Sequence, residues 1–289
     1  MPKVTMPFPN KLASKAASKR PLEAHRIRLT KRDIDILTTL TESKVMTTYQ
    51  LSGLYFPSLQ RARKRLRLLH LAGLIARMTL PVVVQGIPNL YSLSNKGAKM
   101  LNLTSSGRPA HNRLSRSTLA LSSVDHEIAI SEFRTRIANV CKEGGRFRLS
   151  HWRQRSVQKL TAKVVDVAAG QLNAVTIVPD ASFQLNIEDH TLEVYVEVDR
   201  GTMALGRLIN KVKCYSAFCR QQGGLQPEIP ALRVAFIFGS RRRKESFVKS
   251  VEKEIGAAQL RSTFAFLDEG ELTRGMRQAL NNLARQNSN

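Results

Sequence analysis

Three carboxylates occupy one side of a short segment, LEVYVEVDRGT, that runs from Leu192 to Thr202. Apolar residues alternate there with Glu193, Glu197 and Asp199, which is the pattern of a β-strand. Carboxylates at alternate positions of a strand lie about 6–7 Å apart and repel each other unless a positive charge lies between them. We therefore expect this face either to be exposed to water or to hold a metal ion.

Further residues could complete such a site. Asp180 follows a proline, which marks a strand start or a bulge, and a hairpin could bring it beside Glu197. Two carboxylates would supply oxygen ligands for a hard cation such as Mg²⁺ or Mn²⁺. Lys211 lies four residues after Arg207 and four before Tyr215, so a helix would place all three on one face. The lysine could then orient an attacking water or stabilise charge on a scissile phosphate.

The net charge of +24 is concentrated in the front of the chain. Residues 1–116 hold 21 basic and 4 acidic residues, a net of +17, whereas residues 117–289 have a net of +7. An excess of this kind favours binding to a polyanion, because each neutralised phosphate releases counterions. A high pI that merely aids solubility would not explain the uneven distribution.

Composition excludes several other classes. The 289 residues suffice for two domains. The sequence contains no run of about 18 apolar residues, the length that would indicate a membrane span. The basic N-terminus has no apolar segment typical of a secretory signal, and the three cysteines form neither a disulfide framework nor a zinc set. We expect reduced thiols and a cytoplasmic location. The phosphate-binding loop of ATPases, GxxxxGK[ST], is absent from the sequence.

Residues 28–103 have the pattern of a winged helix-turn-helix. Thr30 can cap a first helix, and Thr47 or Thr48 a second. The third predicted helix, SLQRARKRLRLLHLAGLI, has an apolar stripe and ends at Gly73. Two β-runs follow, and the third helix of such a unit usually enters the major groove of DNA. The predicted DNA contacts are Arg61, Lys64, Arg65 and Arg67. A basic amphipathic helix could instead dock on a protein partner or a membrane surface.

The remaining segments complete a two-domain organisation. Residues 1–27 read as a disordered basic arm and residues 104–118 as a polar linker. Residues 119–289 alternate helices and strands in the order α-β-β-β-α-β-α-β-α, with NAVTIVPDASFQLN taken as one strand. This order predicts a mixed α/β domain with helices packed on a central sheet.

Short motifs carry a resemblance to a known family. PD, EVDRGT and KVKCY in the back half, with LTKRDIDIL, RARKRLRLLHLAGLI and YSLSNKGAKML in the front, resemble the replication-relaxation family of mobile-element proteins. The chain is also similar to MobC-type plasmid relaxases. The resemblance implies a winged helix followed by a PD-(D/E)xK-like nuclease domain, which has a restriction-endonuclease-like mixed sheet. It further implies that Asp180 and Glu197 bind the metal, with help from the peptide carbonyl of Val198.

One position departs from that pattern. The lysine expected two residues after Glu197 is replaced by Asp199, which could be a further ligand or a supporting acid. Either Lys211 supplies the missing charge, or the metal is bound differently, or the site is inactive. Glu127, with His126 beside it, could be an extra acid of the kind that some of these nucleases use, and Tyr215 is a further accessory candidate.

These residues predict a DNA-binding relaxase, a nicking endonuclease of a plasmid or integrative element that acts at an origin of transfer or replication. The six histidines are scattered and form no HxH motif, so cleavage should use a metal-activated nucleophile. The expected partners are double-stranded DNA, single-stranded DNA at the nick, and an accessory mobilisation protein. The alternative is a non-catalytic replication initiator or transcriptional regulator with a degenerate nuclease fold.

Overall fold

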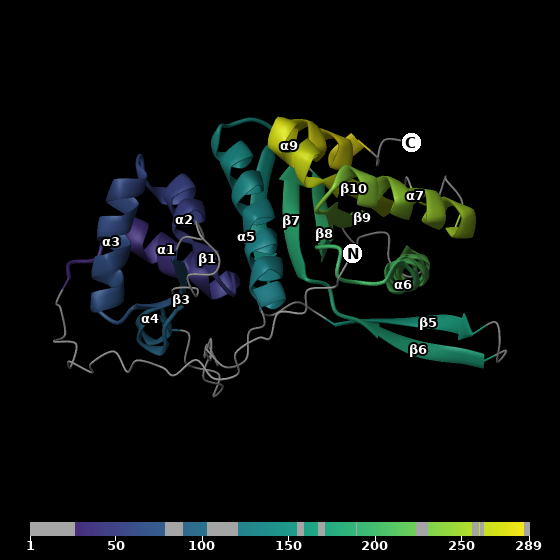
Figure 1. Ribbon diagram of the computed structural model, residues 1–289, viewed down its shortest axis with the longest axis horizontal. Helices are drawn as coiled ribbons and strands as arrows, with labels where there is room; N and C mark the ends of the chain where they lie inside the picture. The colour runs from purple at the N-terminus through teal and green to yellow at the C-terminus, as the bar shows by residue number, and fades with distance from the viewer. Residues whose placement is uncertain are drawn as a thin grey trace, which may run out of the picture.

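The computed structural model places two units side by side, with helix α5 between them (Figure 1). Residues 1–26, 79–88 and 103–120 lie outside the described part, and with them most of the predicted arm and all of the predicted linker. Within the described part, no helix is long and apolar enough to cross a membrane. The structure describes residues 27–78, 89–102, 121–154, 159–166, 171–188, 190–223, 231–255, 260 and 263–285.

The front unit contains helices around a small antiparallel sheet, in which β3 pairs with both β1 and β2. Thr30 and Asp33 form a capping box that starts the first helix, and Thr47 and Gln50 form another that starts the second. Gly73 ends the third helix with a φ of 74°, a conformation that favours glycine. The elements are α1 (Lys31–Glu42), β1 (Met46–Thr47), α2 (Thr48–Tyr55), α3 (Leu59–Leu71), β2 (Ile75–Met78), β3 (Leu90–Leu93) and α4 (Asn95–Met100).

The back unit is a five-stranded mixed sheet with helices on both faces, so the predicted mixed α/β class is confirmed. The strand order is β10-β9-β8-β7-β4. Helices α5 and α9 cover one face, and α6 and α7 cover the other (Figure 1). The elements are α5 (Leu121–Lys142), β4 (Phe147–Arg153), β5 (Leu160–Asp166), β6 (Gln171–Ile177), β7 (Ala181–Ile187), β8 (His190–Asp199), α6 (Leu205–Gly223), β9 (Ala231–Phe238), α7 (Arg241–Ile255), β10 (Phe264–Asp268) and α9 (Glu269–Arg285).

Strand β8 is central, and its two faces enter different cores. Val194 and Val196 pack in the core beneath α5 and α9, as the alternation predicts, while Tyr195 packs with α6 and α7. Of the two alternatives for the acidic face, exposure to water is contradicted for its last two acids. Glu197 is 2% exposed and Asp199 is 4% exposed, because α6 and α7 lie over this face.

Two strand assignments also needed correction. The predicted single strand NAVTIVPDASFQLN is two strands, β6 and β7, because the chain leaves the ladder around Pro179. Strand β5 was not predicted. It pairs with β6 in a separate two-stranded sheet that packs on α6, where Gln221 Nε2 donates to the Lys163 carbonyl at 2.8 Å.

The topology brings the acidic residues to one edge of the sheet. Strands β8, β9 and β10 are parallel, so their carboxyl ends meet at the same edge. Strand β7 is antiparallel to β8 and begins at this edge, with Ala181 opposite Val196. Asp180, Glu197 and Asp199 therefore lie together where ligands usually bind in open α/β sheets.

Candidate active site

Asp180 is held against the end of β8 by its main chain and its side chain. Its N–H donates to the Val196 carbonyl at 3.0 Å, and its Oδ2 accepts from the Val198 N–H at 2.8 Å. Its Oδ1 lies 3.1 Å from Nε2 of His126, which comes from the first turns of α5. The hairpin predicted to bring Asp180 beside β8 is therefore present.

Glu197 meets two residues of α6 on the other side of the strand. Lys211 Nζ donates to Oε2 at 2.5 Å, and the Tyr215 hydroxyl donates to Oε1 at 2.8 Å. One helical turn separates Lys211 from Tyr215, so a single face of α6 reaches both carboxylate oxygens. Asp180, Glu197, Lys211 and Tyr215, which the sequence grouped, are brought together by the fold.

The pKa values of the two acids are shifted in opposite directions. Burial, the largest cause, and the charge of Asp180 together raise the pKa of Glu197 to about 7, against the opposing effect of Lys211 and Tyr215. Burial also acts to raise the pKa of Asp180, but the hydrogen bonds from His126 and Val198, with the charges of His126 and Lys211, together lower that pKa below its usual value. The two carboxylates thus lie close enough to repel each other in a buried setting.

The oxygens of Asp180, Glu197 and the Val198 main chain are of the kind that a small hard cation binds. N–H and C=O of one strand residue point the same way, so the Val198 carbonyl faces the side where its N–H meets Asp180. Mg²⁺ typically binds one or two carboxylates and keeps waters or phosphate oxygens as its other ligands. Across the described ranges there is no group of three or more His, Cys, Asp or Glu side chains that could hold a metal. Any ion here would therefore rest on Asp180, Glu197 and a backbone oxygen.

Two further predicted acids are engaged elsewhere. Asp199 Oδ2 accepts from Arg243 Nε at 2.7 Å, and its Oδ1 accepts from the Gly201 N–H at 3.1 Å. Glu127 bonds Lys44 at 2.6 Å and Gln154 at 2.7 Å. This geometry gives no support to the expectation that Asp199 is a ligand or that Glu127 is an accessory acid. The pairing of Arg243 with Asp199 was not predicted from the sequence, because the two residues lie 44 positions apart.

The basic helix α3 keeps most of its predicted face. Arg61, Lys64 and Arg67 are exposed, and Ala62, Leu66 and Leu69 are buried in the front core. Arg65 differs, because its Nε donates to Asp33 Oδ1 at 2.8 Å and its Nη2 donates to the Arg28 carbonyl. Its charge is already compensated within the front unit, so the prediction that Arg65 contacts DNA is not supported.

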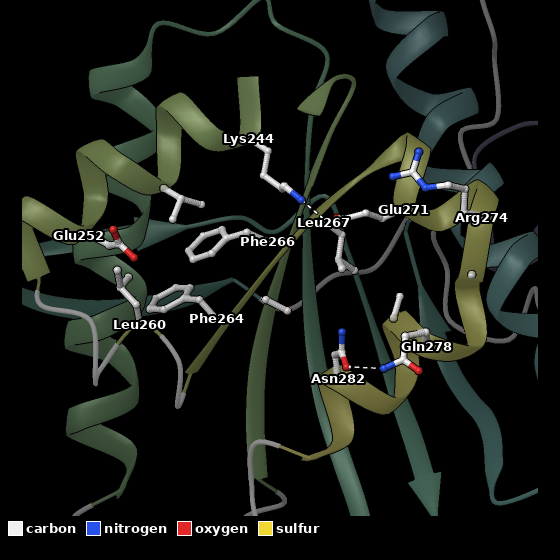
Figure 2. A pocket seen from close by; sticks show the side chains of 14 residues that line it. Lys244, Glu252, Leu260, Phe264, Phe266, Leu267, Glu271, Arg274, Gln278 and Asn282 are labelled. Atoms are coloured by element: carbon white, nitrogen blue, oxygen red, sulfur yellow. Dashed lines mark hydrogen bonds and ion pairs between the residues drawn. The ribbon is translucent and has the colours of Figure 1, made fainter. Parts of the chain in front are cut away.

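A cavity of 590 Å³ lies elsewhere, along the edge strand β10 between α7 and α9 (Figure 2). Phe264 and Phe266 contribute to its apolar lining. At one end Lys244 points toward Glu271, and the ion pair between them measures 2.5 Å (Figure 2). None of the residues around Asp180 and Glu197 lines this cavity, so the cavity and the candidate active site are separate.

Comparison with known proteins identifies the family of the chain. Residues 37–230 match the replication-relaxation family. The chain belongs to this family. The match runs from within α1 to beyond the end of α6, and so includes α3 and the acid pair with Lys211. No curated protein and no solved structure matches the chain. Membership of the replication-relaxation family connects the protein with DNA and with the replication or mobilisation of a plasmid or mobile element.

Proposed function

We propose that this member of the replication-relaxation family is a metal-dependent DNA-nicking endonuclease, a relaxase of a plasmid or integrative element. The observation that carries the proposal is the meeting of Asp180, Glu197 and Lys211 at one sheet edge. A buried carboxylate and a half-buried one that repel each other next to a lysine form an arrangement suited to a divalent cation and a phosphate.

Each side chain has a distinct role in this proposal. Asp180 and Glu197, with the Val198 carbonyl, would hold Mg²⁺ or Mn²⁺. Such an ion supplies Lewis acidity and lowers the pKa of a bound water. His126 holds Asp180 in the ionised form through their 3.1 Å contact, and Tyr215 fixes the orientation of Glu197. Lys211 would stabilise the charge that develops on the scissile phosphate.

The position of Lys211 bears on the absence of a lysine at position 199. PD-(D/E)xK-like sites are expected to carry a lysine two residues after the second acid, where this chain has Asp199. The ammonium group of Lys211 reaches Glu197 from α6 instead. We propose that it takes the place of the strand lysine, while Asp199 binds Arg243 and joins β8 to α7.

We further propose that the front unit is a winged helix that selects the DNA site. Three helices are followed by the antiparallel pair β2 and β3, as in that fold. Arg61, Lys64 and Arg67 on α3 would contact the phosphates, and double-stranded DNA is the expected partner.

The alternative is a DNA-binding initiator or regulator without catalysis. The observation that favours it is the direct ion pair between Lys211 and Glu197, which would also stabilise an inactive fold. The two proposals differ in whether removing the carboxylates abolishes DNA nicking or changes only the stability of the fold.

The test uses a supercoiled plasmid that carries DNA flanking the protein's own gene, incubated with Mg²⁺. Asp180→Asn and Glu197→Gln are expected to lower nicking by at least about 100-fold while DNA binding is retained, because each removes a charge from the metal site. Glu193→Gln, a partly exposed acid of the same strand, is the matched control and should nick like the wild type. Tight binding with no nicked product from the wild type would favour the alternative.

A further inference from the structure

Helix α5 belongs to both units of the molecule. Ile130 and Ile137 lie in the core beneath the sheet, whereas Ala138 packs against the core of the front unit. Figure 1 shows the helix standing between the front unit and the sheet. Units joined only by a linker usually move relative to each other unless their interface is extensive, so the contacts along α5 decide whether these two can move.

Arg134 is the central contact of this interface. Its Nη1 donates to the Thr39 carbonyl at 2.9 Å and to Ser43 Oγ at 2.6 Å, and its Nη2 bonds Glu42. The same guanidinium lies 5.6 Å from the ring centroid of Trp152 in β4. The last turn of α1 has no basic residue of its own, so Arg134 supplies the positive charge that favours its carbonyl end. Pulling the units apart would break the hydrogen bonds of this arginine, which is 6% exposed, to Thr39, Glu42 and Ser43.

Other contacts extend along the helix. Ser131 Oγ donates to the Val45 carbonyl at 2.6 Å, and Gln50 Nε2 donates to the Ile128 carbonyl at 3.0 Å. From residue 127, which binds Lys44, to residue 142, which binds the Leu54 carbonyl, the contacts cover about 22 Å of helix. Contacts spread over this length resist both sliding and rotation of one unit against the other.

The same helix also touches the candidate active site. His126 binds Asp180, and the next residue, Glu127, binds Lys44 of the front unit. Two adjacent positions of one helix thus connect the front unit to the acid pair. The distance from α3 to Asp180 and Glu197 is therefore set by the fold rather than by a flexible linker.

We infer that the α5 interface fixes the number of base pairs between the sequence that α3 recognises and the point where the acid pair meets the DNA. The inference rests on the proposed function, since it assumes that both units contact one duplex. Arg134 is accordingly a specificity-determining residue that touches neither DNA nor metal.

The test is designed to work whether or not the protein cleaves DNA. An iron chelate that cuts DNA by diffusing radicals is attached to Thr202→Cys, an exposed position in the turn after β8. The probes are duplexes recovered from a random-sequence library by binding to the full chain, and the assay contains EDTA and no Mg²⁺. The chain that keeps Thr202 is the control for chelate attached to the native cysteines, Cys141, Cys214 and Cys219.

With the interface intact, the cuts should fall in one narrow window at a constant distance from the recognised sequence. Arg134→Met combined with Ser131→Ala should spread the cuts over several positions while the affinity changes less than about twofold. Arg148→Met, an exposed arginine of β4, is the matched control and should keep the narrow window. Scattered cuts from the intact chain, or an unchanged window in the double variant, would overturn the inference.

Calorimetry covers the case in which no duplex is recovered, an outcome that would refute the proposed function but not the rigid interface. The intact chain should unfold in one transition and the double variant in two. If the double variant does not fold, Ser131→Ala alone is the milder change, and it should split or broaden the single transition of the intact chain. Two separate transitions in the intact chain would overturn the inference without reference to DNA.

Discussion

Glu197 combines properties that seldom occur in one side chain. It is almost fully buried, it lies near the ionised Asp180, and both of its oxygens accept hydrogen bonds from α6. Desolvation and the neighbouring charge disfavour its ionised form, which is why its pKa is raised. A cation bound between the two acids would remove much of this cost. The ionised form of Glu197 is thus disfavoured without a metal, and a cation in the proposed position would favour it.

The raised pKa predicts a specific pH dependence of stability. An acid whose pKa is higher in the folded state contributes stability that is present below its unfolded value, about 4.5, and is lost as pH rises through about 7. The unfolding free energy of the wild type minus that of Glu197→Gln should therefore be larger at pH 5 than at pH 8. Urea unfolding of both proteins in metal-free buffer measures it. A difference that is constant, or larger at pH 8, would refute this assignment.

Lys211 can be tested against a neighbour on its own helix. Lys211→Met should lower nicking by about 100-fold or more, because it removes the ammonium group that is proposed to stabilise charge on the phosphate. Lys213→Met removes an exposed lysine that pairs with Glu254 at 2.7 Å and should leave nicking within about twofold. Both variants are compared by the initial rate on supercoiled plasmid. Equal rates in the two variants would assign Lys211 a structural role only.

At the scale of elements, local signals predicted the helices better than the strands. The caps at Thr30 and Thr47 and the stripe of α3 lie within a few residues of each other, so the sequence contains the whole signal. Strand β5 was missed because its pairing with β6 and its packing on α6 depend on residues far along the chain.

In the candidate site, too, local contacts could be predicted from the sequence and contacts that depend on distant elements could not. Lys211 and Tyr215 share a face by simple helical spacing, and Asp180 and Glu197 meet through one hairpin, so all four could be grouped in advance. The burial of Glu197 could not be foreseen, because it depends on where α6 and α7 lie over β8.

The exposed face of α3 predicts how DNA binding depends on salt. Arg61→Ala combined with Lys64→Ala should weaken binding and reduce the slope of log affinity against log salt by about 0.9 for each phosphate that is no longer neutralised. Fluorescence anisotropy with one duplex at several salt concentrations measures the slope. Lys253→Ala, an exposed cation of α7 in the back unit, is the control and should keep the wild-type slope. An equal reduction in the control would mean that α3 is not the binding face.

At the scale of the whole molecule, the uneven charge and the shared helix act together. The front of the chain concentrates the positive charge that attracts a polyanion, and α5 fixes that unit against the sheet edge with the acid pair. The family match extends into both parts, from within α1 to beyond α6, with the acid pair and Lys211 inside it. A site-selecting unit and a nicking unit in fixed register would suit a protein that acts at one place on a mobile element.

The most direct test is a crystal grown with Mn²⁺ and measured at the manganese absorption edge. The account predicts an anomalous peak about 2.0–2.2 Å from an oxygen of Asp180 and from one of Glu197, with Lys211 beside it. The same crystal form of Asp180→Asn should lose the peak. Peaks that occur only on other acids, or none at all in the wild type, would contradict the proposed metal site and leave a DNA-binding protein without this chemistry.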